Sequence, residues 1–271
     1  MENIRGNTLI INGILADASG YSPDSSADVY YEVIRVIKGK YLFLEEHLLR
    51  LRSSCRKSIL NCPDSSSIIS QLKQLIEYSE ISEGNVKLLF YSVLNKTNIA
   101  CFFTPHFYPS VGDYSSGVKV KSFQFERPDP NIKKWNESFR RKVNRFIRDE
   151  HIYEAILISE KGTLTEGSRS NLFFIDEKDR VITAPLEKVL PGITRNYVFE
   201  ICRELGVPVI EKTVYLDGVT SMKACFITGT SPKVLPVQKL NKIPFNAQHE
   251  TILRISQAFS QHIEKSLNKN V

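Results

Sequence analysis

The residue whose type and position most clearly suggest chemistry is Glu166. It ends one apolar strand segment and precedes the turn Gly167-Ser168-Arg169-Ser170, after which a second apolar strand begins. A lone acid in such a turn is usually exposed to solvent. Two further turns follow here, Leu190-Pro191-Gly192-Ile193-Thr194 and Thr228-Gly229-Thr230-Ser231, and the first opens a helix expected over residues 194–205. Free N–H groups at a helix start bind anions, so the sequence offers an acid followed by candidate phosphate donors.

These three turns, in this order, resemble the signature of the fold type IV pyridoxal-phosphate enzymes, and the resemblance covers about residues 28–237. That family includes D-amino-acid aminotransferases, branched-chain aminotransferases and aminodeoxychorismate lyases. The resemblance implies pyridoxal 5'-phosphate as cofactor and a two-domain α/β fold, with a smaller N-terminal domain and a larger, barrel-like C-terminal domain. The cofactor needs a lysine for its Schiff base, an acid beside its pyridine nitrogen and donors for its phosphate.

The resemblance assigns the Schiff-base lysine to Lys133. The segment Asn131-Ile132-Lys133-Lys134-Trp135-Asn136 is similar to the family's Ile-Lys-x-x-Asn pattern, and it precedes residues 154–157 as the family arrangement requires. Lys134 stays open as the alternative, because the loop before Glu166 holds one extra residue and makes counting back ambiguous. Without the resemblance, the two lysines are an exposed pair at the start of a basic helix.

The resemblance also assigns the other cofactor contacts. Glu166 is expected to keep the ring nitrogen protonated. Arg50, within His47-Leu48-Leu49-Arg50-Leu51, is expected to bind the phosphate through a two-pronged guanidinium contact. His47 is interpreted as a structural neighbour of Arg50. The remaining expected contacts lie in the two later turns: Leu190, Gly192, Ile193, Thr194, Gly229 and Thr230.

Substrate binding is expected from four further residues. Alternation places Tyr31 and Arg35 on one face of a strand over residues 29–37, and Ser231 lies in the last turn. Arg169 is expected to hold the substrate α-carboxylate, because a guanidinium at this place in the turn can bind a carboxylate with two hydrogen bonds. The alternative is that Arg169 points to solvent.

The sequence favours an amino-acid transaminase that leans towards D-amino acids, with pyruvate or 2-oxoglutarate as acceptor. The short chain resembles the D-amino-acid branch, although its strand over residues 86–93 lacks the arginine common there. The alternatives are an L-branched-chain aminotransferase, an aminodeoxychorismate lyase and a catalytically silent pyridoxal-phosphate-binding protein. Val33 counts against the lyase, since similar lyases place a threonine on that strand. A homodimer is implied by the same resemblance.

The length and composition of the chain indicate its number of domains and argue against a membrane-spanning or metal-binding protein. The chain has 271 residues, of which 42% are hydrophobic, enough for two α/β domains, expected over residues 1–113 and 118–271 with a linker around 104–117. No apolar run approaches the roughly 20 residues of a membrane span, and no signal-peptide pattern opens the chain. The five cysteines lack metal-ligand spacing, so we expect no metal, and free thiols in the cytoplasm.

The net charge of +6 does not by itself indicate a nucleic-acid partner. Much of the local excess lies in residues 140–148, where apolar residues follow helical spacing and Arg141, Arg145 and Arg148 fall on another face. Because no nucleic-acid motif accompanies them, these arginines are interpreted as the solvated face of a helix.

Periodicity and turn residues predict the remaining elements. Strands are expected over residues 8–15, 29–37, 86–93, 99–103, 118–125, 155–159, 172–175 and 224–228, and helices over 45–59, 66–78 and 194–205. A C-terminal helix is expected to pack into the core through Ile252, Ile255, Phe259 and Ile263.

Overall fold

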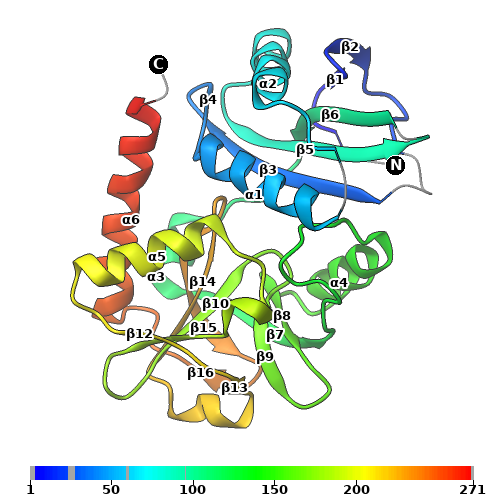
Figure 1. Cartoon of the computed structure of the whole chain (residues 1–271). Coiled ribbons are helices and arrows are strands. Elements are labelled where there is room, and N and C mark those ends of the chain that lie inside the picture. Colours follow the sequence, from blue (N-terminus) through cyan, green and yellow to red (C-terminus); the bar gives the residue numbers. More distant parts are fainter. Residues whose placement is uncertain (1–3, 24–27, 59–60, 95, 270–271) are drawn as a thin grey trace. The chain divides into compact units, whose positions relative to one another are not determined.

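The computed structural model describes residues 4–23, 28–58, 61–94 and 96–269, and the chain divides into two compact units (Figure 1). Unit 1 comprises Met1–Phe107, Ile132–Trp135 and Ile263–Val271, and unit 2 comprises Tyr108–Asn131 and Asn136–His262. This division differs from the single boundary expected between residues 113 and 118.

The difference arises because two short segments return to unit 1 through hydrogen bonds. In the first segment, the backbone N–H of Trp135 donates to the carbonyl oxygen of Val29 at 2.7 Å. In the second, the hydroxyl of Ser266 accepts from the backbone N–H of Phe43 at 3.3 Å, and the carbonyl oxygen of Leu267 accepts from Lys40 Nζ at 2.9 Å. None of these three contacts follows from local sequence patterns.

Unit 1 contains an antiparallel six-stranded sheet in the order β2-β1-β6-β5-β3-β4. The two longest pairings join β5 to β3 and to β6. The strands are β1 (Thr8–Ile11), β2 (Ile14–Asp17), β3 (Val29–Ile37), β4 (Lys40–Tyr41), β5 (Gly84–Val93) and β6 (Lys96–Thr104).

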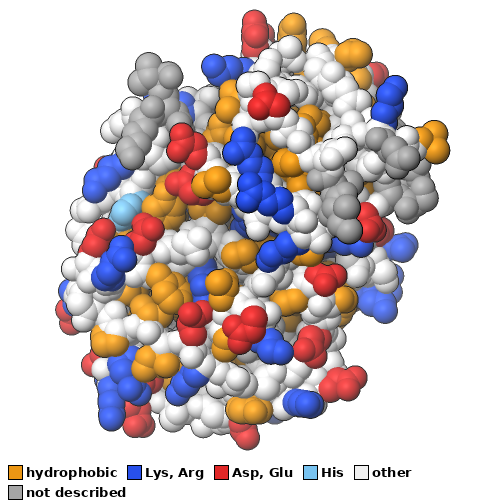
Figure 2. Space-filling view, in the orientation of Figure 1, with side chains coloured by type: hydrophobic (Ala, Val, Ile, Leu, Met, Phe, Trp, Pro, Cys, Tyr) orange, Lys and Arg blue, Asp and Glu red, His pale blue; other side chains and the backbone are white. Residues whose placement is uncertain are grey.

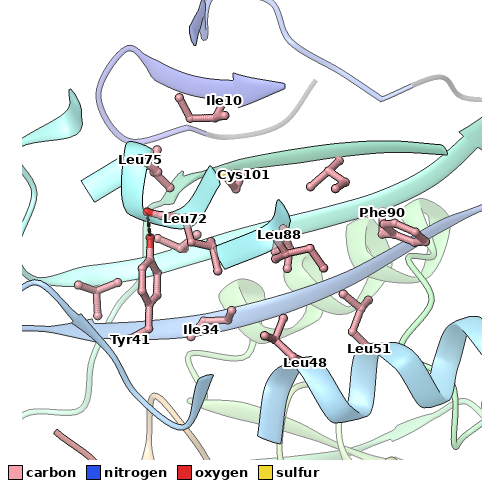
Figure 3. Close-up of a cluster of buried hydrophobic side chains, with 14 of the residues drawn as sticks. Ile10, Ile34, Tyr41, Leu48, Leu51, Leu72, Leu75, Leu88, Phe90 and Cys101 are labelled. Atoms are coloured by element: carbon pink, nitrogen blue, oxygen red, sulfur yellow. Dashed lines mark hydrogen bonds between the residues drawn. The ribbon is translucent and has the colours of Figure 1, made fainter. Parts of the chain in front are cut away.

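Two helices, α1 (Leu44–Lys57) and α2 (Ser65–Ser79), cover one face of this sheet (Figure 3). Leu48 and Leu51 of α1 and Leu72 of α2 pack there against Ile34 and other strand residues, all buried. Each such leucine contributes roughly 1.5–3 kcal/mol when its side chain is fully buried. The Tyr41 hydroxyl, also in this core, donates to the carbonyl oxygen of Leu72 at 2.7 Å.

The first expected strand is in fact a hairpin. Asn12 and Gly13 both have positive φ angles, 51° and 81°, and β1 and β2 pair antiparallel on either side of them. An Asn-Gly pair with both residues left-handed is the turn that matches the twist of a two-residue hairpin. The prediction of one strand over residues 8–15 was therefore wrong, because the apolar residues on both sides hid this turn.

Unit 2 contains a ten-stranded sheet, of which six strands close into a barrel. The ring runs β10-β14-β15-β7-β8-β9 and closes where β9 pairs with β10 through Glu166 and Asn171. One buried cluster takes residues from all six strands, among them Val120, Ile156, Leu172 and Ile227, and so fills the barrel interior. The expected α/β fold with a barrel-like second part is confirmed.

The bounds of the elements of unit 2 are as follows. Its strands are β7 (Val118–Gln124), β8 (Glu154–Ile158), β9 (Thr163–Gly167), β10 (Asn171–Ile175), β11 (Val181–Thr183), β12 (Val209–Glu211), β13 (Val214–Tyr215), β14 (Ala224–Gly229), β15 (Lys233–Leu240) and β16 (Ile243–Pro244). Its helices are α3 (Val111–Ser116), α4 (Glu137–Asp149), α5 (Ile193–Glu204), two 3-10 turns (Leu186–Lys188 and Asp217–Ser221) and α6 (Glu250–Lys269), which ends in unit 1.

The expected linker over residues 104–117 contains helix α3. Ser110 and Asp113 form a capping box, in which each side chain accepts from the other's backbone N–H, and this pair starts the helix despite its low apolar content. Within the described ranges, no helix is long and apolar enough to cross a membrane. The core-packing helix at the C-terminus is confirmed, since Ile252, Ile255 and Phe259 are fully buried.

Helix α4 confirms the interpretation of a solvated basic face. Arg141, Arg145 and Arg148 are exposed, while Phe139 and Val143 are buried. Acidic and basic side chains are interspersed on the face of the molecule that Figure 2 shows. Arg140 differs from its neighbours because it is buried and donates to the carbonyl oxygen of Ser168 at 2.8 Å.

Gly117, which precedes β7, allows a first prediction. Its φ angle is 76°, and an added Cβ would lie 2.7 Å from the backbone nitrogen of Gln238. Gly162 has the same φ angle, but nothing lies within 4 Å of its virtual Cβ. We expect Gly117→Ala to lower the free energy of unfolding by about 2–3 kcal/mol and Gly162→Ala by only about 1 kcal/mol. Urea unfolding checks this, and equal losses would contradict the clash.

Candidate active site

Lys133 lies in a short segment that extends the sheet of unit 1. The carbonyl oxygen of Lys133 accepts from the backbone N–H of Tyr31 at 3.1 Å, the N–H of Trp135 donates to Val29 at 2.7 Å, and Tyr30 and Lys134 form an antiparallel bridge. The segment therefore pairs with the edge of β3. Because side chains alternate in such a pairing, the side chains of Lys133 and Lys134 point in opposite directions.

The two lysines have different surroundings. Lys133 is half-buried, and its Nζ lies 4.6 Å from the centre of the Tyr31 ring. Lys134 is exposed, and its Nζ lies 2.7 Å from the carboxylate of Asp28. Lys133 is thus turned towards the buried groups of β3 and lies near His47, whereas Lys134 is turned to solvent and paired with a surface carboxylate. The geometry therefore favours Lys133 as the attachment point.

Arg50 is bound side-on by a buried carboxylate that the sequence analysis did not single out. Glu32 is fully buried and accepts from Arg50 Nε at 2.8 Å, from Arg50 Nη2 at 2.5 Å and from His47 Nδ1 at 2.8 Å. Burial acts to raise the pKa of Glu32, but the charge and hydrogen bonds of Arg50, with those of His47, outweigh it and hold the pKa at about 2. The guanidinium is thus fixed in direction by an ionised partner.

His47 is the third member of this cluster. Burial is the main cause that lowers the pKa of His47, and the charges of Arg50 and Lys133 act in the same direction, against the hydrogen bond and charge of Glu32. His47 is therefore neutral at physiological pH. This agrees with its interpretation as a structural neighbour, and the contribution from Lys133 indicates that the lysine amine lies within electrostatic range of the cluster.

The opposite face of β3 carries the expected substrate residues of unit 1. Tyr31 and Arg35 alternate with Glu32 along the strand, so they point away from the cluster of Arg50. Lys87 of β5 is paired with Val33 and shares the face of Tyr31. Lys87 is only 4% exposed, and its Nζ lies 3.5 Å from the centre of the Trp135 ring. The sequence analysis missed this buried cation on a strand noted only for lacking arginine.

In unit 2, Glu166 lies where the barrel closes. Its carboxylate is 3% exposed. Arg127 Nε lies 2.6 Å from Oε1, an ion pair rather than an aligned hydrogen bond. Oε2 accepts from the backbone N–H of Leu190 at 3.0 Å and, at 3.5 Å, from Nδ2 of Asn171, its partner across the strands. Arg127 therefore supplies this buried carboxylate with a cationic partner.

The start of helix α5 supplies the expected anion site. Gly192 is the N-cap and has no side-chain cap, so the first N–H groups of the helix remain for a ligand. A Cβ on Gly192 would overlap Asn171 Oδ1. Among the described residues, the buried hydroxyls of Thr194 and Thr228 have no hydrogen-bond partner. Buried hydroxyls are rarely left unpaired, so both suit a ligand oxygen.

The last turn lies close to the Glu166 turn. A Cβ on Gly229 would lie 3.7 Å from the carbonyl oxygen of Arg169. Thr228 of β14 pairs with Asn171 of β10. Thr230 and Ser231 come two and three residues later in the chain, so they lie next to this pair. Unit 2 therefore brings Glu166, Leu190, Gly192 and the last turn together around Asn171, which the sequence analysis quoted but did not assign.

Arg169 lies differently from its neighbours in the turn. Its side chain is exposed, and its guanidinium donates to the side-chain oxygen of Asn144 on α4. Glu166 has Arg127 as its cationic partner instead. The structure thus gives Arg169 an exposed position, as in the solvent-facing alternative, and its role as a carboxylate anchor stays a prediction.

Comparison with known proteins decides the family. The model of the amino-transferase class IV family matches residues 30–240. The chain belongs to this family. A D-alanine aminotransferase of Bacillus licheniformis is 27% identical over 86% of this chain and 88% of its own length. A probable branched-chain-amino-acid aminotransferase of Thermotoga maritima is 30% identical over 79% and 78%.

A solved structure supports the fold. The branched-chain amino acid aminotransferase of Escherichia coli superposes with a TM-score of 0.82 at 19% identity, over 96% of this chain and 95% of its own. The protein is a class IV aminotransferase that depends on pyridoxal phosphate. The residues of this chain fit the cofactor, because the unpaired hydroxyls and uncapped start of α5 suit a phosphate and the buried carboxylate of Glu166 suits a ring nitrogen.

The cluster of Glu32 gives a second prediction. Glu32→Gln leaves the Arg50 charge in an environment arranged for an anion, so we expect a loss of about 3–5 kcal/mol in the free energy of unfolding at pH 7. The folded-state pKa is depressed from 4.5 to about 2, so this stabilisation is complete above pH 4.5 and declines as the pH falls towards 2. The deficit of the variant should shrink over that same window.

Urea unfolding at several pH values measures this deficit. Glu150→Gln is the matched control, because Glu150 also pairs with a single cation, Lys121, but both side chains are more than a third exposed. We expect the control to lose at most about 1 kcal/mol. A deficit in Glu32→Gln that stays constant down to pH 2 would contradict the ionised pair.

Proposed function

We propose that this enzyme transfers amino groups between a D-amino acid and a 2-oxo acid such as pyruvate or 2-oxoglutarate. The observation that carries this preference is the match to a D-alanine aminotransferase, which spans 86% of this chain and 88% of the relative. The match to the branched-chain relative is slightly higher in identity but spans less of both chains. The proposal thus places the protein in the D-amino-acid branch of its family.

In this proposal, Lys133 attaches the cofactor and moves the proton at the substrate Cα. When bound, pyridoxal phosphate accepts the electrons released as the Cα–H bond breaks. Glu166 holds the ring nitrogen in its protonated form, supported by the ion pair with Arg127. Arg50, oriented by Glu32, and the start of α5 hold the phosphate.

The proposal also includes further residues that contact the cofactor or the substrate. Leu190, Ile193, Thr194, Gly229 and Thr230 complete the binding of the cofactor. Tyr31, Arg35, Arg169 and Ser231 bind the substrate. To reach a substrate α-carboxylate, the guanidinium of Arg169 would have to give up its hydrogen bond to Asn144. The side chain of Arg35 already lies on the same face of β3 as Tyr31. The homodimer and the cytoplasmic location stay predictions.

A second candidate function is L-branched-chain amino-acid transamination. The Thermotoga maritima relative, at 30% identity, carries that name, and Arg35 provides a strand guanidinium beside Tyr31 without an arginine on β5. This candidate uses the same lysine, acid and phosphate contacts. The two candidate functions differ only in the stereochemistry and the side chain of the amino-acid donor.

The attachment of the cofactor can be tested with paired variants. Lys133→Ala should remove the borohydride-trapped cofactor from the peptide containing residues 131–135 and lower turnover by at least about 10²–10⁴-fold, because both the attachment point and the proton carrier are lost. Lys134→Ala should keep both, since its amine is exposed and paired with Asp28. Mass spectrometry locates the trapped adduct. The reverse result would move the attachment to Lys134.

The choice of substrate can be tested by half-reactions. Holoenzyme mixed with D-alanine or D-glutamate should convert its cofactor at least about tenfold faster than with L-leucine or L-valine, because the site discriminates by the placement of the carboxylate and side chain around Cα. Stopped-flow absorbance measures each rate. Faster conversion with the L-amino acids would establish the second candidate and leave the aminotransferase assignment intact.

A further inference from the structure

A second buried carboxylate, Glu154 at the start of β8, lies under the turn that follows Glu166. Glu154 is 4% exposed. Its Oε1 accepts from the hydroxyl of Ser168 at 2.7 Å and from the N–H of Ala155 at 2.9 Å. Its Oε2 accepts from the N–H of Arg169 and the hydroxyl of Ser170, both at 3.1 Å. One carboxylate thus binds all three residues between β9 and β10.

The same turn is held from its other side by two arginines. The carbonyl oxygen of Ser168 accepts from Arg127 Nη2 at 2.9 Å and from Arg140 Nη2 at 2.8 Å. The N–H of Ser168 donates to the carbonyl oxygen of Ala155 at 2.8 Å. A side chain on Gly167 would overlap Ser170 Oγ and approach Glu154 Cγ at 3.0 Å, so the turn is closely packed against Glu154.

The turn over residues 168–170 is linked to Glu166 in two ways, through the backbone and through Arg127. Glu166 stands two residues before Ser168, and Arg127 touches both the carbonyl oxygen of Ser168 and the carboxylate of Glu166. A shift of the turn would therefore move the backbone of Glu166 and the cation that pairs with it. The side-chain position of Glu166 depends on the turn in two ways.

We propose that Glu154 is a positioning residue, which fixes the carboxylate of Glu166 towards the cofactor's ring nitrogen by holding the turn. This inference rests on the proposed function in that Glu166 is the partner of that nitrogen. A carboxylate suits the task because it only accepts hydrogen bonds, and four donors face it. An amide in its place would turn an N–H₂ group towards one pair of donors, so that the turn must shift or lose contacts.

The test compares Glu154→Gln with a matched control in the same unit. Asp176 follows β10 at its other end, is 8% exposed, and holds the next turn by accepting from the N–H groups of Lys178 and Arg180 and from the Arg180 guanidinium. Asp176→Asn therefore loosens a comparable turn on the same strand. Glu166→Ala serves as the reference for loss of the contact with the ring nitrogen.

The first measurement is hydrogen exchange of the apo protein, followed by mass spectrometry. Glu154→Gln should speed exchange in residues 166–170 at least about tenfold without a change in residues 176–180, because a turn that loses its acceptor opens more often. Asp176→Asn should show the opposite pattern. Unchanged exchange in residues 166–170 would overturn the proposal, because Glu154 would then not hold the turn.

The second measurement is the ratio of dissociation constants for the 1-deaza analogue, with carbon in place of the ring nitrogen, and for pyridoxal phosphate itself. The analogue lacks the nitrogen that would contact Glu166, so the unaltered protein should bind it at least about tenfold more weakly than pyridoxal phosphate. Glu166→Ala should bring the ratio close to one, Glu154→Gln should lower it at least about threefold, and Asp176→Asn should leave it within about twofold.

The outcomes separate the two proposals. If Glu166→Ala lowers the ratio but Glu154→Gln does not, the positioning role is overturned while the assignment of Glu166 stands. If Glu166→Ala leaves the ratio unchanged, the proposed partner of the ring nitrogen is wrong, and the role of Glu154 falls with it. Faster exchange in residues 166–170 together with a lower ratio, in Glu154→Gln but not in Asp176→Asn, supports the proposal.

Discussion

The arrangement of unit 2 around its candidate site depends on one cross-strand pair, Glu166 opposite Asn171. This pair joins β9 to β10 across a short turn, while the other pairings of the ring include β10 with β14 and β15 with β7, which lie far apart in the sequence. The pair also gathers the site residues. The side chain of Asn171 contacts Glu166 and the carbonyl oxygen of Leu190, and it leaves room for only a glycine at position 192. The same residue, Asn171, thus takes part in a pairing of the barrel and in the grouping of these candidate residues.

The cluster of unit 1 follows a different principle. There, a fully buried glutamate compensates an arginine and is itself stabilised by that arginine and a histidine. Such a group is costly to bury unless each member is paired, and the pairing fixes the guanidinium before any ligand arrives. A preformed cation loses less conformational entropy on binding phosphate than a mobile one does. The buried carboxylate of Glu32 thus fixes the direction of Arg50, which we propose as a phosphate ligand.

Much of the fold was predictable from local patterns. The strand at Val29–Ile37 was predicted with its observed bounds, and the helices α1, α2 and α5 within about two residues. The hairpin at Asn12 was missed because apolar residues flank it on both sides. Helix α3 was missed because it depends on a capping box rather than on apolar periodicity. The barrel itself entered through the family resemblance, since its closure involves residues paired through space.

Candidate residues of the site could be named from sequence motifs, and their roles stay predictions, but the residues that contact them could not be named in this way. Glu166, Gly192 and Arg50 stand in recognisable motifs, whereas Glu32, Arg127, Glu154 and Lys87 act through contacts that only folding creates. Glu154 is the one charged residue of β8, and Glu32 lies among apolar residues of β3, which carries one further charge at Arg35. A buried charge needs partners. That signal was present in the sequence and could have marked both residues. The choice of Arg127 as partner of Glu166 carried no such signal, because nothing local distinguishes it from other arginines.

The contacts of residues 132–135 and of Ser266 and Leu267 with unit 1 have a consequence for how the chain is made. During synthesis residues 28–107 precede residues 132–135, so the edge of β3 receives its extra pairing only after residue 135 has been made, and the contacts of Ser266 and Leu267 form later still. Long-range contacts of this kind slow folding. Unit 1 therefore starts before unit 2 in the chain and is completed after it, and the edge of β3 stays open to other chains until residues 133–135 have been made.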